Sequence, residues 1–169
     1  DNARVEFTTL SYGNTLPKFF LWWGNLGIYF IESLGIGEFL QIIWVILFPV
    51  RKLKNDEKSA YQEICSLGNI PYSNICVHVN SPICRINGGR AVASMNIIHV
   101  PENRYSLDLV MHELTHIVQY TRIGANYMLE ALYAQFWGAG YDYGDLSEAR
   151  ARNQKFSHFN REQQAQIIQ

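Results

Sequence analysis

A concentration of apolar residues between positions 16 and 50 constrains this chain more than any other feature of its sequence. The segment reads LPKFFLWWGNLGIYFIESLGIGEFLQIIWVILFPV. A helix that crosses a bilayer needs about 20 mostly apolar residues, and here Glu32, Gly35, Gly37 and Glu38 divide the stretch. The two glycines predict a break between two short apolar helices. The first interpretation is therefore an N-terminal helical hairpin that packs on the rest of the chain.

Two other interpretations of residues 16–50 stay open. Arg51, Lys52 and Lys54 follow the segment, and a basic flank is typical of a segment that contacts a membrane or is translocated. A true bilayer span is the third interpretation. A secretory signal is disfavoured, because the run lies too far from residue 1 and no basic region opens the chain. We therefore expect this segment to contact a membrane or a carrier protein if it does not pack internally.

Length and composition limit the number of domains and the kinds of partner. The chain has 169 residues, 17% of them charged, and a net charge of −1. This suits one domain with an appended element, and it argues against a nucleic-acid surface, which needs clustered Lys and Arg. The polar stretch at 52–58 predicts a boundary between an apolar helical element (1–55) and a second domain (56–169). An initial Asp1 predicts a piece of a longer or processed polypeptide.

The cysteine pattern leaves the redox compartment open. Cys65, Cys76 and Cys84 form no C-x-x-C pair, so a zinc–thiolate site is disfavoured. One disulfide, between Cys76 and Cys84, is compatible with the sequence.

Helices and strands are expected in a regular order after residue 55. We expect a helix over 57–67, strands over 75–79 and 96–100, and a turn at 87–89. A helix then begins after Ser106, an N-cap residue, and continues to about residue 121. A further helix is expected over 127–137, and a last one begins near Asn160, with Gln163 as its capping-box partner.

The sequence His112-Glu113-Leu114-Thr115-His116 lies inside the helix that begins after Ser106. Residues four apart lie on one helix face, so two imidazoles at this spacing can bind a single Zn²⁺. Glu113, beside the first histidine, is placed to reach a metal-bound water rather than the metal, as a general base does. The motif therefore predicts a zinc site with Glu113 as the catalytic residue.

A catalytic zinc needs a third protein ligand. Glu130 in the helix over 127–137 and Glu162 at the start of the last helix compete for this role. Asp142, Asp145 and His158 are weaker candidates, because each lies in a Gly-rich or polar loop.

From about residue 56 onward the chain resembles zincin-like metallopeptidase domains linked to bacterial contractile injection systems. Such domains occur at the C-termini of VgrG-type spike proteins of type VI secretion and in Rhs-type toxins. The resemblance is carried by the segments ICVHV (75–79), NIIHVP (96–101), MHELTHIVQY (111–120), GYDY (140–143) and FNREQQAQII (159–168).

The resemblance implies an α+β, zincin-like fold, in which the motif helix packs with a small, mostly antiparallel sheet and further helices. It also implies a gluzincin-like site with His112, His116 and a distant glutamate as metal ligands, which favours Glu162 over Glu130. A strand over 96–100 would bind an extended substrate by strand addition, and Tyr120, Tyr141 or Tyr143 would hold the oxyanion.

The function that follows is a zinc-dependent peptidase that hydrolyses peptide bonds through a metal-activated water. The resemblance implies an effector or toxin, cytoplasmic before export and then secreted or delivered by a bacterial secretion system. Its partners would be a protein or peptide substrate and, for a toxin, an immunity protein. The alternative is a membrane-interacting or binding module with a structural or vestigial metal site.

Overall fold

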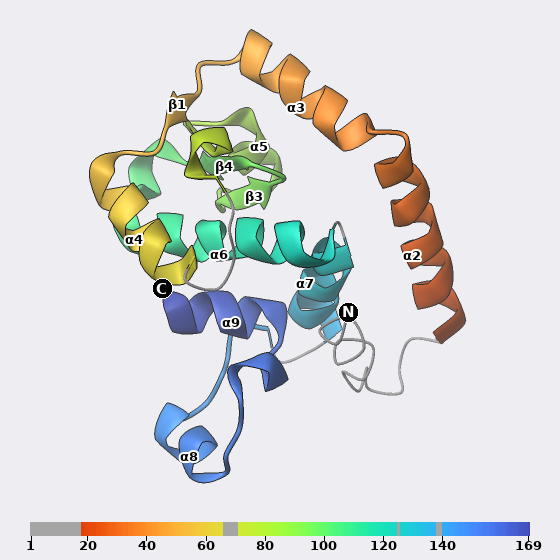
Figure 1. Ribbon diagram of the computed structural model, residues 1–169, viewed down its shortest axis with the longest axis vertical. Helices are drawn as coiled ribbons and strands as arrows, with labels where there is room; N and C mark the ends of the chain where they lie inside the picture. Colours follow the sequence, from red (N-terminus) through yellow and green to blue (C-terminus); the bar gives the residue numbers. More distant parts are fainter. Residues whose placement is uncertain (1–17, 66–70, 125, 138–139) are drawn as a thin grey trace.

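The structure, a computed structural model, describes residues 18–65, 71–124, 126–137 and 140–169, without the side chains of 18–22, 63–65 and 132–137. Within these ranges the fold is α+β, as expected, with eight α-helices and one four-stranded sheet (Figure 1). Three short 3₁₀ turns cover Tyr72–Asn74, Glu102–Arg104 and Phe156–His158.

The sheet has the order β1-β2-β4-β3. Its strands are β1 (Arg51–Lys52), β2 (Cys76–Val79), β3 (Val92–Ser94) and β4 (Ile97–Val100). The pairs β1–β2 and β3–β4 are antiparallel, and β2–β4 is parallel, so the sheet is mostly antiparallel. The two expected strands correspond to β2 and β4, whereas β1 and β3 were not predicted. Because β1 pairs with β2, residues 51–52 belong to the same sheet as the strands that follow them.

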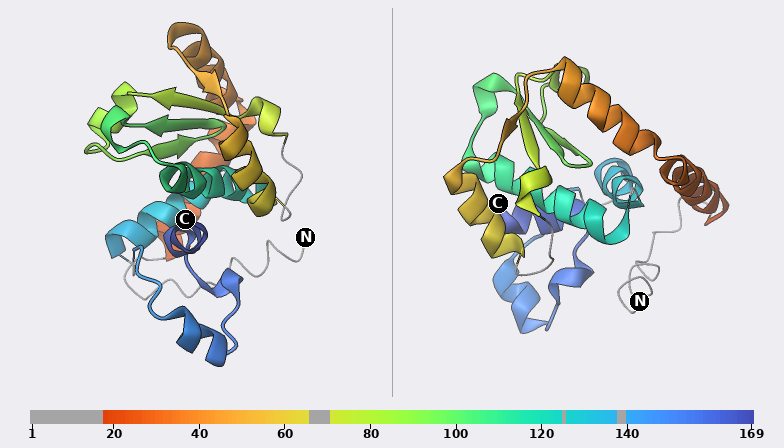
Figure 2. Two further views of the ribbon diagram at one scale, coloured as in Figure 1. Left: turned by 90° about the vertical axis from the view of Figure 1, so that its left-hand side faces the viewer. Right: turned by 45° about the horizontal axis from the view of Figure 1, so that its top comes forward.

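The long helix α6 (Leu107–Ile123) packs on one face of the sheet and carries the histidine motif. Its N-cap is Ser106, as predicted, whose hydroxyl accepts a hydrogen bond from the Leu109 N–H at 3.1 Å. Figure 2 shows the layers, with α6 beneath the sheet and α9 (Arg161–Ile168) beneath α6. The core between sheet and helix is aliphatic, with Val77, Ile98, Val100, Leu114 and Ile117 fully or almost fully buried.

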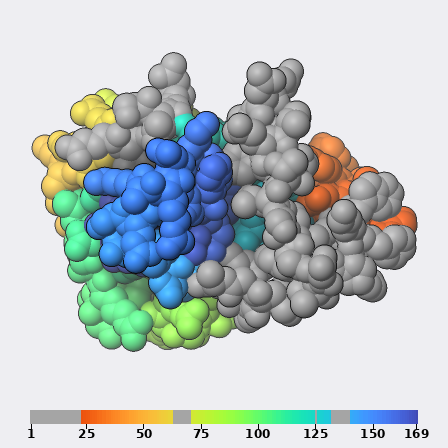
Figure 3. Space-filling view, turned by 90° about the horizontal axis from the view of Figure 1, so that it is seen from below, coloured from red at the N-terminus to blue at the C-terminus, as the bar shows by residue number. Residues whose placement is uncertain are grey.

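The remaining helices flank this core. They are α4 (Asn55–Cys65), α5 (Pro82–Ile86), α7 (Asn126–Trp137) and α8 (Leu146–Ala151). The start of α9 confirms the predicted capping box, since the Asn160 side chain accepts from the Gln163 N–H while the Gln163 side chain accepts from the Asn160 N–H. Seen from below, the C-terminal segment lies across the molecule and α2 lies at one edge (Figure 3).

The predicted N-terminal hairpin is present as α2 (Lys18–Ser33) and α3 (Ile36–Leu47). The chain turns at Gly35, whose φ of 63° is a left-handed conformation that glycine adopts without strain. The two helices meet at a bend of 58°. Among the described helices, none is long and apolar enough to cross a membrane alone. Taken together, the two helices of this bent pair have the length and the composition of a membrane span.

The face of the sheet opposite α6 carries two buried imidazoles beneath α3. The Trp44 Nε1–H of α3 donates to His78 Nδ1 at 2.9 Å, and Ser81 Oγ lies 2.9 Å from His99 Nδ1. Cys76 and Cys84 are both buried free thiols, so the disulfide that the sequence allowed between them is not formed.

Candidate metal centre

The two motif histidines lie together on the buried side of α6. Their rings are 4.9 Å apart between centroids, at an interplanar angle of 80°, and each residue is 6% exposed. The i, i+4 spacing accounts for this proximity. The helix therefore presents two imidazoles to the same small volume.

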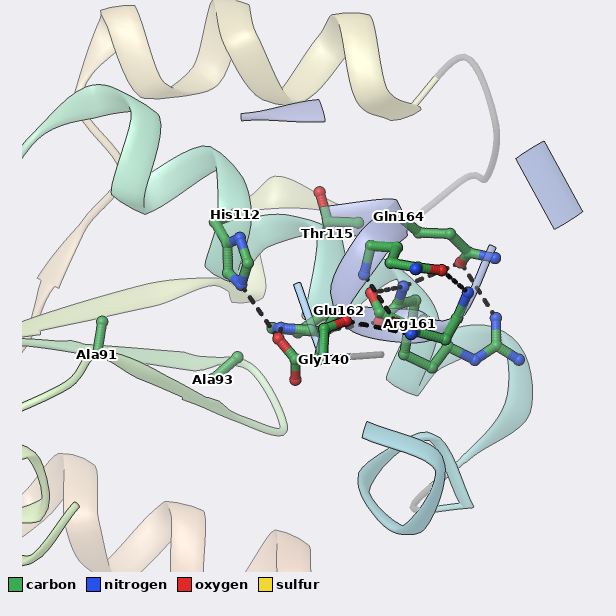
Figure 4. A network of polar contacts seen from close by, with 12 residues as sticks. Ala91, Ala93, His112, Thr115, Gly140, Arg161, Glu162 and Gln164 are labelled. Atoms are coloured by element: carbon green, nitrogen blue, oxygen red, sulfur yellow. Dashed lines mark hydrogen bonds and ion pairs between the residues drawn. The ribbon is translucent and has the colours of Figure 1, made fainter. Parts of the chain in front are cut away.

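The first turn of α9 brings Glu162 to these imidazoles, although it is distant in sequence (Figure 4). Glu162 Oε2 lies 3.5 Å from Nε2 of His112 and 3.5 Å from Nε2 of His116. These separations are long for hydrogen bonds, but ligands about 2.0–2.1 Å from a tetrahedral ion stand roughly 3.3 Å apart. The three ligand atoms all lie within 4.8 Å of one another, so this buried group could bind a metal ion.

The electrostatics of this group favour a bound cation. Burial disfavours the charged form of Glu162, but the two imidazoles outweigh it and lower the pKa of Glu162 to about 2. Burial likewise disfavours a charged His116, yet the Glu162 and Glu113 carboxylates raise the pKa of His116 to about 8. The site thus stabilises a positive charge, which can be a proton on an imidazole or a metal ion that displaces it.

Gln119, one turn after His116, fixes the tautomer of that histidine. Its Nε2 donates to the Arg161 carbonyl oxygen and to Gln164 Oε1, both at 3.1 Å. Because a carbonyl oxygen only accepts, the amide nitrogen must face Arg161, and Gln119 Oε1 must face His116 Nδ1 at 2.8 Å. In the neutral form of His116, Nδ1 therefore carries the proton and the lone pair of Nε2 is directed at the site.

The competing carboxylate, Glu130, points elsewhere. Glu130 Oε2 accepts from Arg161 Nε at 2.6 Å, and both side chains are largely buried. The structure therefore groups Glu162, rather than Glu130, with the two histidines. Among the weaker candidates, Asp142 accepts from the Gly144 N–H, and Asp145 caps α8. His158 is exposed.

Glu113 lies beside the histidines, buried and facing β3. Burial raises the pKa of its carboxyl group, and the nearby histidine charges and the Ala93 N–H, which donates a backbone hydrogen bond to it, only partly offset that effect. In the described part of the chain, Glu113 Oε2 is buried without a hydrogen-bond partner. Such an atom can accept a proton or a hydrogen bond from a molecule in the site.

A cavity of about 180 Å³ opens onto this group and is lined by β3 as well as by the helices. The expectation that the strand over 96–100 binds substrate by strand addition is wrong, because β4 is paired on both sides, with β2 and with β3. The sheet edge at the cavity is β3. Its Ala93 carbonyl already accepts from the Tyr127 hydroxyl at 2.9 Å, and Ala91 lines the cavity beside it.

Of the three tyrosines considered from the sequence, Tyr141 lies in the cavity wall. Its ring centroid is 5.8 Å from that of His112. Burial, together with the charge of Glu162, raises the pKa of Tyr141 to about 12. Its hydroxyl is therefore protonated near neutral pH, and its side chain is hydrogen-bonded to Glu162.

Comparison with known proteins does not assign this chain, since no family model, no curated protein and no solved structure matches it. The fold and the site together define an α+β protein with a candidate metal centre. Sequence reasoning missed the contributions of Gln119, Ala93 and Arg161, because each acts through a contact between elements far apart in the chain.

Proposed function

We propose that this protein is a zinc-dependent metallopeptidase, with His112, His116 and Glu162 as the ligands and Glu113 as the general base. One observation carries the proposal: two imidazole nitrogens each lie 3.5 Å from one carboxylate oxygen, close to the separation of two ligands on a tetrahedral ion, and all three atoms lie within 4.8 Å of one another. Catalytic zinc is commonly bound by two histidines and one carboxylate, an arrangement that leaves the fourth position open for water. Bound zinc would supply Lewis acidity, which acidifies water and polarises a peptide carbonyl.

The protein's own groups have defined tasks in this proposal. Glu113 takes the proton of the attacking water on its unpartnered Oε2 and later delivers it to the leaving amine nitrogen. A peptide substrate occupies the cavity that the metal ligands, Glu113 and β3 line.

The test is the Glu113→Gln variant, digested against a peptide library and read by mass spectrometry. The variant should retain one zinc per chain and lose cleavage, while the exposed control Glu148→Gln keeps both. Cleavage by Glu113→Gln at the wild-type rate would refute the assignment, as would wild-type protein that binds no zinc.

The wider biological role rests on the sequence resemblance alone. We propose on that basis an effector or toxin domain delivered by a bacterial secretion system, with an immunity protein as its partner in the producing cell. Toxicity on expression in a bacterial host, abolished by Glu113→Gln, is the expected outcome.

A second candidate is a membrane-interacting module whose metal is structural or vestigial. The exposed apolar helices α2 and α3 favour it. Chelation separates the candidates: this module has no proteolysis to lose, whereas a peptidase loses cleavage when zinc is removed and recovers it when zinc is restored.

A further inference from the structure

Exposed apolar side chains gather on α2 and α3. Of the 19 large apolar residues exposed in the described chain, 13 lie between Trp23 and Leu47, and we call this set the apolar arc. Ile46 is 75% exposed and Phe39 is 63% exposed, and α3 contains no fully buried residue. The two helices run along the rim of the molecule (Figure 1). A patch of this extent on a folded chain marks an interaction surface.

The apolar arc carries little charge. Between Trp23 and Leu47 the only charged residues are Glu32 and Glu38. Burial raises the pKa of Tyr120 on α6, and the charges of Glu38 and Glu32 raise it further. Glu32 is half-buried against Gly124 at the end of α6, whereas Glu38 is exposed. The exposed surface of the arc is otherwise mainly aliphatic and aromatic.

Helix length and attachment decide how such a surface could meet a bilayer. The 12 residues of α3 extend about 18 Å at 1.5 Å per residue, whereas the hydrocarbon core is about 30 Å thick. The inner side of α3 is held on the sheet by the Trp44–His78 hydrogen bond. The arc therefore suits a helix pair lying in the plane of one leaflet rather than a span.

Basic side chains follow directly after the arc. Lys52 and Lys54 are both exposed, and each lysine near a membrane surface gains about 1 kcal/mol from anionic lipid. A protein partner of the usual kind would meet a rim rich in hydrogen-bonding groups, whereas Glu38 is the one exposed charged residue among the described residues of the arc. Hydrocarbon bordered by anionic headgroups complements both features.

We propose that the apolar arc is a membrane-binding surface, which inserts into one leaflet of a bilayer that contains anionic phospholipid. The inference is independent of the proposed peptidase activity, because no residue of the metal centre takes part in it.

The experiment is flotation of the full-length chain with vesicles of phosphatidylcholine, with and without phosphatidylglycerol. Phe39→Glu and Ile46→Glu should each lower the partition coefficient at least tenfold. The matched control is Ile86→Glu, at a residue 89% exposed but outside the arc, which should float as wild type does. Replacing Lys52 and Lys54 by Gln should lower binding to the anionic vesicles about fivefold per lysine and leave binding to the neutral vesicles unchanged.

A second measurement keeps the inference testable if the arc variants fail to fold. Brominated phospholipids should quench the tryptophan fluorescence of the wild-type chain, because the half-exposed Trp23 would enter the acyl region. Absence of flotation and of quenching would overturn the inference. So would a stable dimer in solution that buries the arc and ignores vesicles, or an Ile86→Glu variant that loses binding as fully as Ile46→Glu does.

Discussion

Gln119 offers the sharpest test of the candidate metal centre, because it touches a ligand without being one. We predict that Gln119→Met weakens zinc binding by 10- to 100-fold. The substitution keeps the length of the side chain but removes the acceptor that holds the Nδ1–H of His116 at 2.8 Å. Loss of such a partner typically costs 10–100-fold in metal affinity, which is about 1.4–2.7 kcal/mol.

The effect on metal binding must be separated from a general loss of stability. Gln119 also donates to Arg161 and Gln164, so its replacement should lower the free energy of unfolding of the metal-free chain by about 1–3 kcal/mol. Gln164→Met is the matched control. It removes a buried amide of the same network but leaves the His116–Gln119 contact intact.

The assay is a competitive titration of zinc against a fluorescent chelator, with urea unfolding of the metal-free chain beside it. Both variants should unfold at lower urea concentrations, and only Gln119→Met should lose zinc affinity by tenfold or more. Equal losses of affinity in the two variants, or none in Gln119→Met, would refute the argument that this amide sets the histidine tautomer.

Three further predictions concern stability and site assembly. Glu57→Gln should lower the free energy of unfolding by about 2 kcal/mol, because the buried carboxylate accepts two hydrogen bonds from Arg51 at 2.7 Å; the exposed control Asp56→Asn should stay within about 0.5 kcal/mol of wild type. Burial and the neighbouring His78 lower the pKa of His99 to about 4. The fold therefore has its full stability above the unfolded pKa of about 6.5, where His99 is neutral, and loses about 3 kcal/mol as the pH falls from 6.5 to 4. The urea midpoint of unfolding should decline less steeply over this pH range in His99→Gln than in the wild-type chain. Asn160→Ala should lower the free energy of unfolding by about 1 kcal/mol, because it removes an N-cap. It should also weaken zinc binding, because this cap orders the turn that carries Glu162. Urea unfolding and titration against a chelator would measure the two effects.

Local signals in the sequence predicted the elements that carry the metal centre. Ser106 and Asn160 stand at helix starts because their side chains satisfy N–H groups that a helix leaves unpaired, and that chemistry is readable without the fold. The apolar residues of β2 and β4 likewise predicted two buried strands.

The missed elements are short. β3 covers only Val92–Ser94, too few residues for an alternating pattern, and it is a strand because β4 pairs with it. α5 was missed although Ser81 and Pro82 form a helix start signal. Strand addition was consequently expected at β4, which is paired on both sides, because an edge is a property of the assembled sheet rather than of any one segment.

The choice between Glu130 and Glu162 could not be made from the sequence. Both are glutamates on helices that pack near α6, and no spacing separates them. Arg161 makes the difference, since its side chain is buried and pairs with Glu130. A buried guanidinium must be paired, and with Glu130 engaged in this way Glu162, the adjacent residue on α9, remains to face the histidines.

The first turn of α9 therefore concentrates the contacts on which the centre depends. Glu162 supplies the oxygen atom, the Arg161 carbonyl orients Gln119, and the Arg161 side chain engages the competing carboxylate. A metal ion bridging α6 and α9 would stabilise their packing, by about 2.7 kcal/mol at a free concentration 100 times its dissociation constant. By the same linkage, a change that leaves α9 undocked in a large fraction of the molecules lowers metal affinity, even where it touches no ligand. Assembly of the site and docking of this last helix are thus coupled.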